Sequence, residues 1–227
     1  MSEGTTRRYS GRTLDELKLA RRERLLDAAL ELYGTDGYPA TSVERLCTAA
    51  KVSTRHFYQE FPNKEAVLIA VHGRLVELAL QSTAKALAEA PASPITARLE
   101  GAVTAYLETV MADQRRARLA FVEVVGASPE VERQRLAFRE TIIALVEYEG
   151  GAAVARGEIE PRDFRFAGMA FIGAVNAVVY DWFLHEPRPP RAQFQASLVD
   201  LAVTLLTRDP GPAPGSVPRT EPGPGAG

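Results

Sequence analysis

The chain has 227 residues, with 27 Lys and Arg against 29 Asp and Glu, a formal net charge of −2, and one cysteine. This composition is typical of a soluble globular protein with one large domain or two small ones, and one cysteine excludes a disulfide framework or a thiolate zinc site. Of the 27 basic residues, 23 are Arg. Because Ala, Gly and Pro are also abundant, we attribute this excess to a GC-rich genome and not to nucleic-acid binding.

The amino-terminal segment, residues 1–18, is expected to be a flexible basic arm followed by the start of the first helix. The arm carries Arg7, Arg8 and Arg12 and has no apolar core, so it does not resemble a signal peptide. Thr13-Leu14-Asp15-Glu16 has the spacing of a capping box, in which the hydroxyl and the carboxylate each satisfy a free backbone N–H group. A helix is therefore predicted to begin here.

Residues 19–79 are predicted to form a helical domain with a helix-turn-helix at 42–61. The first helix places apolar residues from Leu25 to Tyr33 on one face and ends near Gly34 and Gly37. Thr41-Ser42-Val43-Glu44 is a second capping box, with Thr41 expected as the cap. The helix that follows buries a stripe consisting of Val43, Leu46, Cys47 and Ala50.

A second short helix is predicted to begin after its cap, Ser53. Phe57 and Phe61 are one turn apart and must point inward, which turns Arg55, His56 and Gln59 outward and leaves Tyr58 on the flank. Arg, His and Gln side chains can match the donors and acceptors of base edges. A short helix with this outer face therefore suits the major groove of DNA.

Further helices are expected along the rest of the chain, and strand patterns are almost missing. Asn63 caps a helix from about Lys64 to Glu89, and helices five to seven cover roughly 95–156. Serine caps precede proline at 93–94 and 128–129, Pro161 opens another helix, and the last runs near Arg191 to Thr207. The predicted class is all-α, with about nine helices.

Residues 166–184 are the one candidate for a membrane span. Asn176 and Asp181 interrupt this apolar stretch, and the run before Asn176 is too short to cross a bilayer. We expect a helix that is covered on several faces inside the protein, and no membrane association. At the carboxyl end, eleven of the nineteen residues from 209 to 227 are Pro or Gly, which predicts a disordered tail.

The amino-terminal region resembles the TetR family of bacterial transcriptional repressors. The matching residues run from Arg24 to Tyr33 and from Gly37 to Val43, then through Val52-Ser53, Phe57-Tyr58 and Phe61 to Asn63-Lys64-Glu65. About 50 residues share the family's order and spacing. The resemblance implies that Tyr58 and Lys64 bind DNA phosphates and that Thr41 is a cap that contacts the DNA backbone. The residues expected to contact DNA are Thr41, Ser42, Arg45, Ser53, Thr54, Arg55, His56, Tyr58, Gln59 and Lys64.

Several of these roles stay open. Arg55 can reach a base or a phosphate, and His56 can read a base, touch the backbone or be a bystander. Two positions also depart from the family pattern. Lys51 replaces the usual Gly of the turn, which costs roughly 1 kcal/mol if the left-handed conformation is kept. Glu60 replaces a common His, and its carboxylate must either turn away from phosphate or accept from a cytosine amine.

The positive charge is concentrated near this region. Residues 1–24 hold seven basic and four acidic side chains, and residues 41–64 hold four and two. From residue 73 onward the balance is 16 basic to 19 acidic. The surplus, although modest, lies where phosphate neutralisation requires it.

Residues 80–208 resemble the family's effector-binding and dimerisation domain, less specifically. Candidate cavity residues are Tyr106, Met111, Phe121, Glu123, Tyr148, Met169, Phe171, Asn176, Tyr180 and Trp182. Each has a plain alternative, since aromatic and Met stripes are often core, and buried Glu123 and Asn176 can make structural hydrogen bonds. His72 is a candidate for coupling the cavity to the DNA-binding domain. Arg115, Arg116 and Arg118 are interpreted as a solvated helix start.

In the family the last two helices pack against their two-fold mates as a four-helix bundle. The residues expected at this dimer interface are Val175, Val178, Val179, Trp182, Phe183, Phe194, Leu198, Leu201 and Leu205. Stripes this apolar are unusual on the surface of a monomer.

The resulting hypothesis is a homodimeric repressor that binds a palindromic operator and is released by a small hydrophobic or amphipathic effector. No cofactor or metal is expected. An enzyme is disfavoured because the sequence lacks HExxH, GxSxG and a phosphate loop. An activator, or a regulator controlled by a protein partner, remains an alternative. The expected location is the cytoplasm, on the nucleoid when DNA is bound.

Overall fold

The computed structural model describes residues 14–208; the arm at 1–13, including Thr13 of the first capping box, and the tail at 209–227 lie outside the described residues. The described chain is all-α, as predicted, with nine α-helices and one π-helical turn, η1. The elements are α1 (Leu14–Thr35), α2 (Val43–Ala50), α3 (Thr54–Glu60), α4 (Lys64–Glu89), α5 (Ile95–Val110), α6 (Gln114–Arg118), η1 (Leu119–Glu123), α7 (Pro129–Ala155), α8 (Phe164–Leu184) and α9 (Arg191–Thr207).

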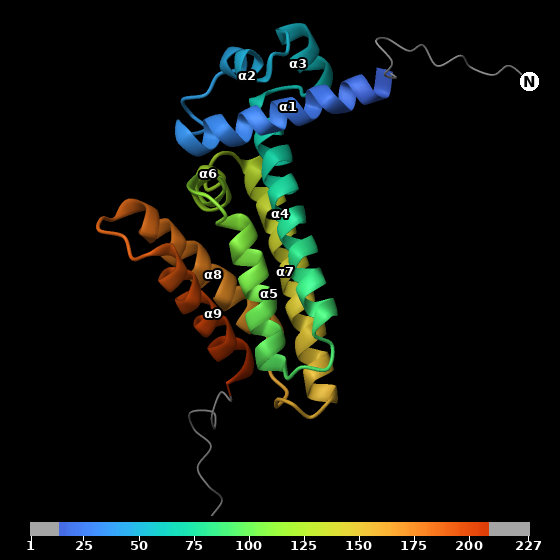
Figure 1. Cartoon of the computed structure of the whole chain (residues 1–227), viewed down its shortest axis with the longest axis vertical. Helices are drawn as coiled ribbons and strands as arrows, with labels where there is room; N and C mark the ends of the chain where they lie inside the picture. Colours follow the sequence, from blue (N-terminus) through green and yellow to red (C-terminus); the bar gives the residue numbers. More distant parts are fainter. Residues whose placement is uncertain (1–13, 209–227) are drawn as a thin grey trace, which may run out of the picture.

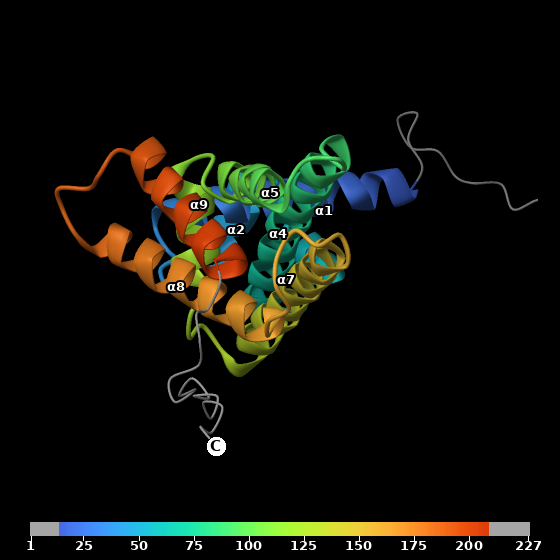
Figure 2. The same cartoon turned by 90° about the horizontal axis from the view of Figure 1, so that it is seen from below.

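Helices α1 to α3 form one end of the molecule, and the long α4 leads from them into the body (Figure 1). There α4 packs along α5 and also contacts α7, while α8 and α9 pair and cover α7 and α5 (Figure 2). The short α6 and η1 lie against α1, between the two ends (Figure 1).

Local capping signals explain most of the helix starts. Ser53, Asn63 and Ser128 each accept the backbone N–H three residues on, which confirms these three predicted caps. Three predicted starts are corrected: Ser42 and not Thr41 caps α2, α8 begins at Phe164 behind the cap Asp163 and not at Pro161, and Ser93 does not cap α5. Helix α5 begins without a side-chain cap of its own, and its Ile95 N–H donates to Glu158 Oε2 at 2.5 Å.

The core of the α1–α3 end follows the predicted apolar stripes. Leu25, Ala29, Tyr33 and Phe57 are fully buried, and Phe61 is nearly so. From α2, Leu46, Cys47 and Ala50 are buried and Val43 packs against them. The single cysteine is therefore a core residue of the helix-turn-helix.

Helix α8 differs from its expectation. It is long and apolar enough to cross a membrane by length and composition alone, but only 22% of its most apolar window is buried within the chain. Six of its exposed residues, spaced three or four apart, form one stripe along the helix, which we call the α8 stripe: Phe166, Met169, Gly173, Ala177, Tyr180 and Leu184. Arg165, Val178 and Asp181 are exposed beside it. The neighbouring helices cover only the face of α8 opposite this stripe. The prediction that this helix is covered on several faces is therefore wrong for the single chain.

His72 is buried between α4 and α7. Its ring meets the Phe138 ring edge-on, with 5.5 Å between centroids. Burial, and secondarily the nearby Arg135 guanidinium, lowers the pKa of His72 from 6.5 to about 4. His72 does not line the cavity described below, which removes the geometric basis for the predicted link from the cavity.

We expect the folded protein to lose stability as the pH falls from 7 to 4. The unfolded chain binds a proton at His72 below about pH 6.5, whereas the folded chain does so only near pH 4. Protonation therefore favours unfolding in this window, by up to about 3 kcal/mol at its acidic end. Urea unfolding of His72→Leu between pH 7 and 4 should show a flatter profile than wild type. His185→Leu, at an exposed histidine, is the control, and an equally steep profile in His72→Leu contradicts the assignment.

Candidate nucleic-acid interface and effector cavity

The turn between α2 and α3 keeps the geometry of a glycine turn. Lys51 has φ 52° and ψ 48°, in the left-handed region, and Val52 N–H donates to Cys47 O at 3.0 Å. The lysine at this position therefore bears the strain that the sequence suggested, and the turn is not altered.

Lys51→Gly should accordingly stabilise the fold, by roughly 1 kcal/mol, because glycine adopts this conformation without a Cβ clash. Part of the gain is offset by the greater flexibility of glycine in the unfolded chain. Urea denaturation measures the effect, with Lys85→Gly inside α4 as a control that should destabilise. A loss of stability in Lys51→Gly would show that the lysine is not strained.

Helix α3 presents a polar outer face. Arg55, His56, Tyr58 and Gln59 are exposed, while Phe57 between them is fully buried. Tyr58 is 57% exposed and rests edge-on against Phe57, so its hydroxyl end is free to reach a partner. The cap organises this face, because Ser53 Oγ lies 3.0 Å from His56 Nδ1 and also accepts the His56 N–H. Ser53 and Thr54 are exposed beside it.

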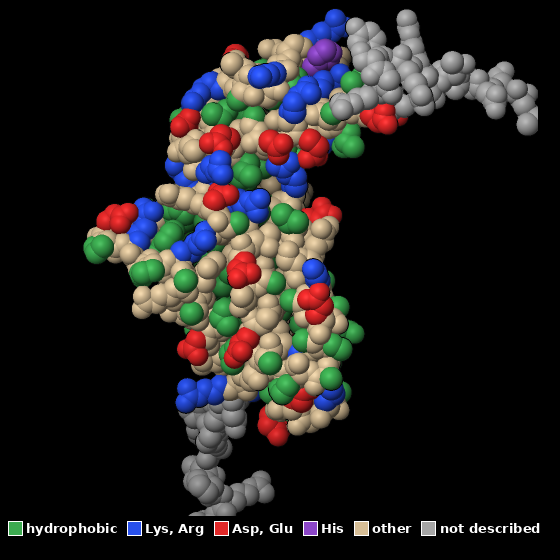
Figure 3. Space-filling view, in the orientation of Figure 1, with side chains coloured by type: hydrophobic (Ala, Val, Ile, Leu, Met, Phe, Trp, Pro, Cys, Tyr) green, Lys and Arg blue, Asp and Glu red, His purple; other side chains and the backbone are tan. Residues whose placement is uncertain are grey.

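Ser42 and Arg45 are exposed at the start of α2. Arg45 is held there by the Ala40 carbonyl at 3.0 Å and by an ion pair with Asp36. Lys and Arg side chains are numerous on the α1–α3 end of the molecule (Figure 3). The outward side chains of α2 and α3 thus form a polar surface with basic residues at its margin.

Two predicted contacts with the DNA backbone take other partners. Thr41 is 1% exposed and its hydroxyl donates to Gly37 O, so its side chain stabilises the α1–α2 turn and does not face DNA. Lys64 Nζ donates to Tyr38 O and Thr41 O, both at 3.1 Å, and lies over the Tyr38 ring. These carbonyls engage the ammonium that was expected to bind phosphate. The Glu60 carboxylate turns away from the outer face of α3, which was one of the two alternatives for it, and accepts a hydrogen bond from Arg21 at 3.3 Å.

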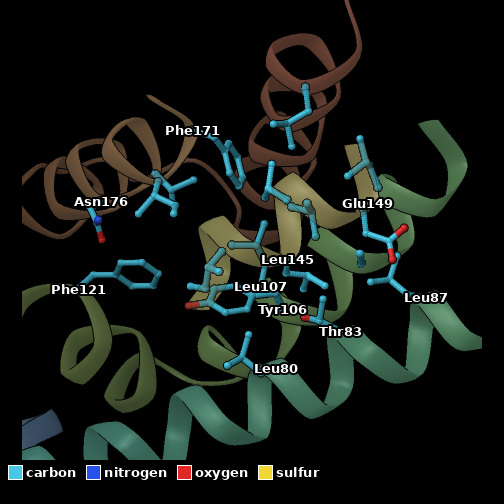
Figure 4. A pocket seen from close by; sticks show the side chains of 18 residues that line it. Leu80, Thr83, Leu87, Tyr106, Leu107, Phe121, Leu145, Glu149, Phe171 and Asn176 are labelled. Carbon is cyan, nitrogen blue, oxygen red and sulfur yellow. The ribbon is translucent and has the colours of Figure 1, made fainter. Parts of the chain in front are cut away.

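A cavity lies between α4, α5, η1, α7, α8 and α9, and the space between the atoms there is about 840 Å³ when open solvent at the mouth is included. Four predicted residues line it, namely Tyr106, Phe121, Phe171 and Asn176 (Figure 4). Burial raises the pKa of Tyr106 to about 12, so its phenol stays protonated. The residues that sequence reasoning missed are mostly aliphatic, such as Leu80, Leu87 and Leu145, and include Thr83 and Glu149. Their spacing is that of ordinary core, which gave no signal for a cavity.

The other predicted cavity residues lie elsewhere. Met111 is 1% exposed within the core, and its carbonyl accepts from Arg191. Tyr148, on the outer side of α7, is 72% exposed, and Met169 and Tyr180 belong to the α8 stripe. Trp182 stacks on Phe194 with 5.5 Å between ring centroids. These positions are corrected because helical spacing places a residue on a face but does not identify what that face meets.

Glu123 is buried for a structural reason. Its Oε2 accepts the Tyr38 N–H at 2.7 Å, and its Oε1 accepts from Arg118 Nε at 2.7 Å. Arg118 also donates to Thr35 O at 2.6 Å, and Arg115 pairs with Glu31. Arg115 is exposed in the first turn of α6, as interpreted from the sequence, but it and Arg118 also have partners in α1. With Glu123, they join α6 and η1 to the end of α1 and the turn after it; we call these contacts the α1–η1 joint.

The predicted dimer residues divide into two groups. Val175, Val179, Phe194 and Leu198 are buried inside the single chain, with Val175 on the cavity, so they cannot also form an outer surface. Val178 is exposed, and Trp182, Phe183, Leu201 and Leu205 are half-buried. The sequence pattern thus mixed the inner and outer faces of α8 and α9. Residues 14–208 contain no cluster of His, Cys, Asp or Glu that could hold a metal ion.

Two known family models match the chain, one at each end of the molecule. Residues 25–71, which contain α2, α3 and the polar surface, match the family described as bacterial regulatory proteins, tetR family. Residues 92–206, which contain most of the cavity, match the tetracyclin repressor-like C-terminal domain. The second match alone spans more than half of the chain.

Individual relatives agree over nearly their whole length. The uncharacterized HTH-type transcriptional regulator YhgD of Bacillus subtilis (strain 168) is 24% identical over 194 residues, covering 82% of this chain and 96% of that protein. A regulatory protein of the tetR family from Rhodococcus RHA1 has a TM-score of 0.65 at 24% identity, covering 82% and 97%. FadR from Bacillus subtilis, solved in complex with stearoyl-CoA, has a TM-score of 0.69 at 19% identity, covering 80% and 97%. The chain belongs to the TetR family of transcriptional regulators, which are DNA-binding proteins and not enzymes.

Proposed function

We propose that the protein is a homodimeric repressor that binds a palindromic operator and is released by a small hydrophobic or amphipathic effector. The observation that carries this proposal is the position of η1. Phe121 of η1 lines the cavity, and two residues later Glu123 holds the backbone of Tyr38 in the α1–α2 turn. One five-residue turn thus touches both the space for an effector and the part of the molecule that faces DNA.

DNA recognition is assigned to the outer face of α3. Arg55, His56 and Gln59 supply donors and acceptors for base edges, and Tyr58 and the start of α2 border the groove. Two copies of α3 must lie about 34 Å apart to enter successive major grooves on one side of DNA. When bound, the protein is expected on the nucleoid.

Dimerisation is assigned to the α8 stripe. It leaves a row of apolar side chains uncovered along most of a 21-residue helix, with Phe166 66% and Leu184 61% exposed. A second copy of the chain can cover it by the same stripe, as an isologous contact requires, and the small Gly173 and Ala177 at its centre allow two helices to approach closely. A membrane is the less suitable partner, because the opposite side of α8 packs on α7 and α9.

An effector in the cavity is expected to act through the α1–η1 joint. A π-helical turn is a rare conformation that is frequently found at functional sites. An occupant that displaces Phe121 has a direct route to Glu123, and hence to Tyr38 and the angle of α1. An effector shifts the equilibrium only as far as its affinities for the DNA-bound and released states differ, typically 5–150-fold.

Glu123→Gln is expected to uncouple effector from DNA. The FadR neighbour binds stearoyl-CoA, which makes that molecule the first probe. In wild type we expect stearoyl-CoA to weaken binding to the DNA upstream of the protein's own gene, by 5–150-fold in fluorescence anisotropy. In Glu123→Gln, the ratio of DNA affinities without and with stearoyl-CoA should fall toward one, while the affinity for stearoyl-CoA stays the same.

Glu130→Gln, which changes an exposed ion pair with Arg133, is the matched control. A full response in Glu123→Gln contradicts the proposed route, and no response in wild type excludes stearoyl-CoA as the effector. A reporter driven by the same upstream DNA separates the two directions of control: its output should rise when the gene is deleted, and a fall identifies an activator instead.

A further inference from the structure

The cavity ends at a buried ion pair. Glu149 of α7 lines the cavity, and its Oε2 accepts from Arg98 Nη2 of α5. The two side chains are only 8% and 10% exposed. The carboxylate lies beside Leu87, at the opposite end of the cavity from Phe121 and Asn176 (Figure 4).

Apolar side chains lie near this pair, and the nearest further charge, the Glu158 carboxylate, is itself paired with Arg156. Ile95, Leu99 and Leu206 form a buried cluster there, with Ala153 and Ala167. Removing two charges from water costs free energy that their attraction often fails to recover, and well-packed apolar residues are frequently as stable in such places. In addition, Arg98 Nε is buried without a hydrogen-bond partner among the described residues. Stability of the fold is therefore a poor explanation for the pair.

Glu149 has unused capacity to accept hydrogen bonds. An ionised carboxylate offers about four acceptor positions and no donor, and Arg98 provides one hydrogen bond to it. Thr83, the nearby polar side chain of the lining, is already satisfied, since its hydroxyl donates to Ala79 O at 2.9 Å. The remaining wall at this end is aliphatic. An occupant that meets Glu149 thus meets an acceptor in an otherwise apolar space.

We propose that the effector donates a hydrogen bond to Glu149 from an uncharged hydroxyl or amide group that reaches this end of the cavity. This inference rests on the proposed effector role of the cavity and specifies the ligand chemistry of its inner end. A carboxylate or phosphate at this position would face Glu149 at short range without a proton to share. An ammonium would leave a net positive charge buried in an apolar cluster, since Arg98 already balances Glu149. An uncharged donor avoids both costs.

The test uses the full chain and four probes with the same alkyl chain: octan-1-ol, methyl octyl ether, octanoate and octylamine. Binding is followed by displacement of the uncharged dye N-phenyl-1-naphthylamine. We expect octan-1-ol to bind about tenfold more tightly than methyl octyl ether, the gain from one hydrogen bond to a charged group. Octanoate and octylamine should both bind more weakly than the alcohol. Tighter binding by the ether, the acid or the amine overturns the proposal.

The double variant Arg98→Met, Glu149→Leu replaces the pair with apolar side chains of similar size. It should fold, bind the dye, and bind octan-1-ol and the ether equally. Thr83→Val, at a lining residue whose hydroxyl is already satisfied, should keep the tenfold preference. A preference that survives in the double variant overturns the role of Glu149, and the wild-type comparison tests the proposal even if this variant does not fold.

The outcomes also distinguish this inference from the proposed function. If all four probes displace the dye without preference, the cavity binds ligands and only the role of Glu149 fails. If neither the dye nor any probe binds, the effector role of the cavity fails together with the inference.

Discussion

If the protein is the dimer proposed above, Tyr180→Glu is expected to convert it into a monomer and to lower operator affinity by about 100-fold or more. Tyr180 is 41% exposed within the α8 stripe, so a two-fold contact would bury the new carboxylate twice without a partner. A monomer binds one half-site and loses the gain from linking two binding events, which is commonly 10²–10⁴-fold. Sedimentation gives the oligomeric state, and fluorescence anisotropy gives the affinity.

Tyr148→Glu is the matched control for this substitution. It makes the same change at a tyrosine that is 72% exposed on a different helix, α7, and should leave both oligomeric state and affinity unchanged. A dimeric Tyr180→Glu with normal operator binding would exclude the α8 stripe as the interface. Dimerisation must then use another surface.

Arg55→Ala is expected to weaken operator binding by about 1–3 kcal/mol for each half-site, the range for one good base contact. Arg55 is exposed on α3, and no intramolecular ion pair holds it among the described residues, so its guanidinium is available to DNA. A base contact predicts a loss on the operator and little change on unrelated DNA. A phosphate contact predicts a loss of affinity for both DNAs, and the affinity of the variant should then depend less on salt concentration. Fluorescence anisotropy on the two DNAs at several salt concentrations decides between them.

Arg133→Ala provides the control for loss of one positive charge, because Arg133 is exposed on α7, in the effector-binding half of the chain. Its operator affinity should match wild type. Equal affinities for wild type and Arg55→Ala on every DNA would remove α3 as the recognition helix.

Local signals were sufficient for the helices. Asn63 and Ser128 begin their helices as predicted, and α4 and α9 have the predicted bounds, because caps and apolar spacing act over a few residues. The outer face of α3 was equally predictable, since two aromatic residues one turn apart fix its inner side. One predicted cap was displaced by a single residue: Thr41 was expected to cap α2, and the next residue, Ser42, does so.

Side-chain partners distant in sequence were not predictable. Lys64 was assigned to phosphate, but three-dimensional proximity gives it the carbonyls of the α1–α2 turn. Glu123 pairs with the backbone 85 residues away, and no periodicity indicates such a contact. Aliphatic residues of the cavity look like core in the sequence because both are apolar at helical spacing.

By itself, then, the sequence determined the all-α class, the helix-turn-helix and the residues that face outward from it, since these depend on interactions within a few turns of helix. Only the tertiary structure decided which face of α8 is left uncovered, how η1 holds the α1–α2 turn, and where a buried ion pair meets the cavity. The physical reason is that a helix pattern defines faces, whereas the packing of helices distant in sequence decides what each face contacts.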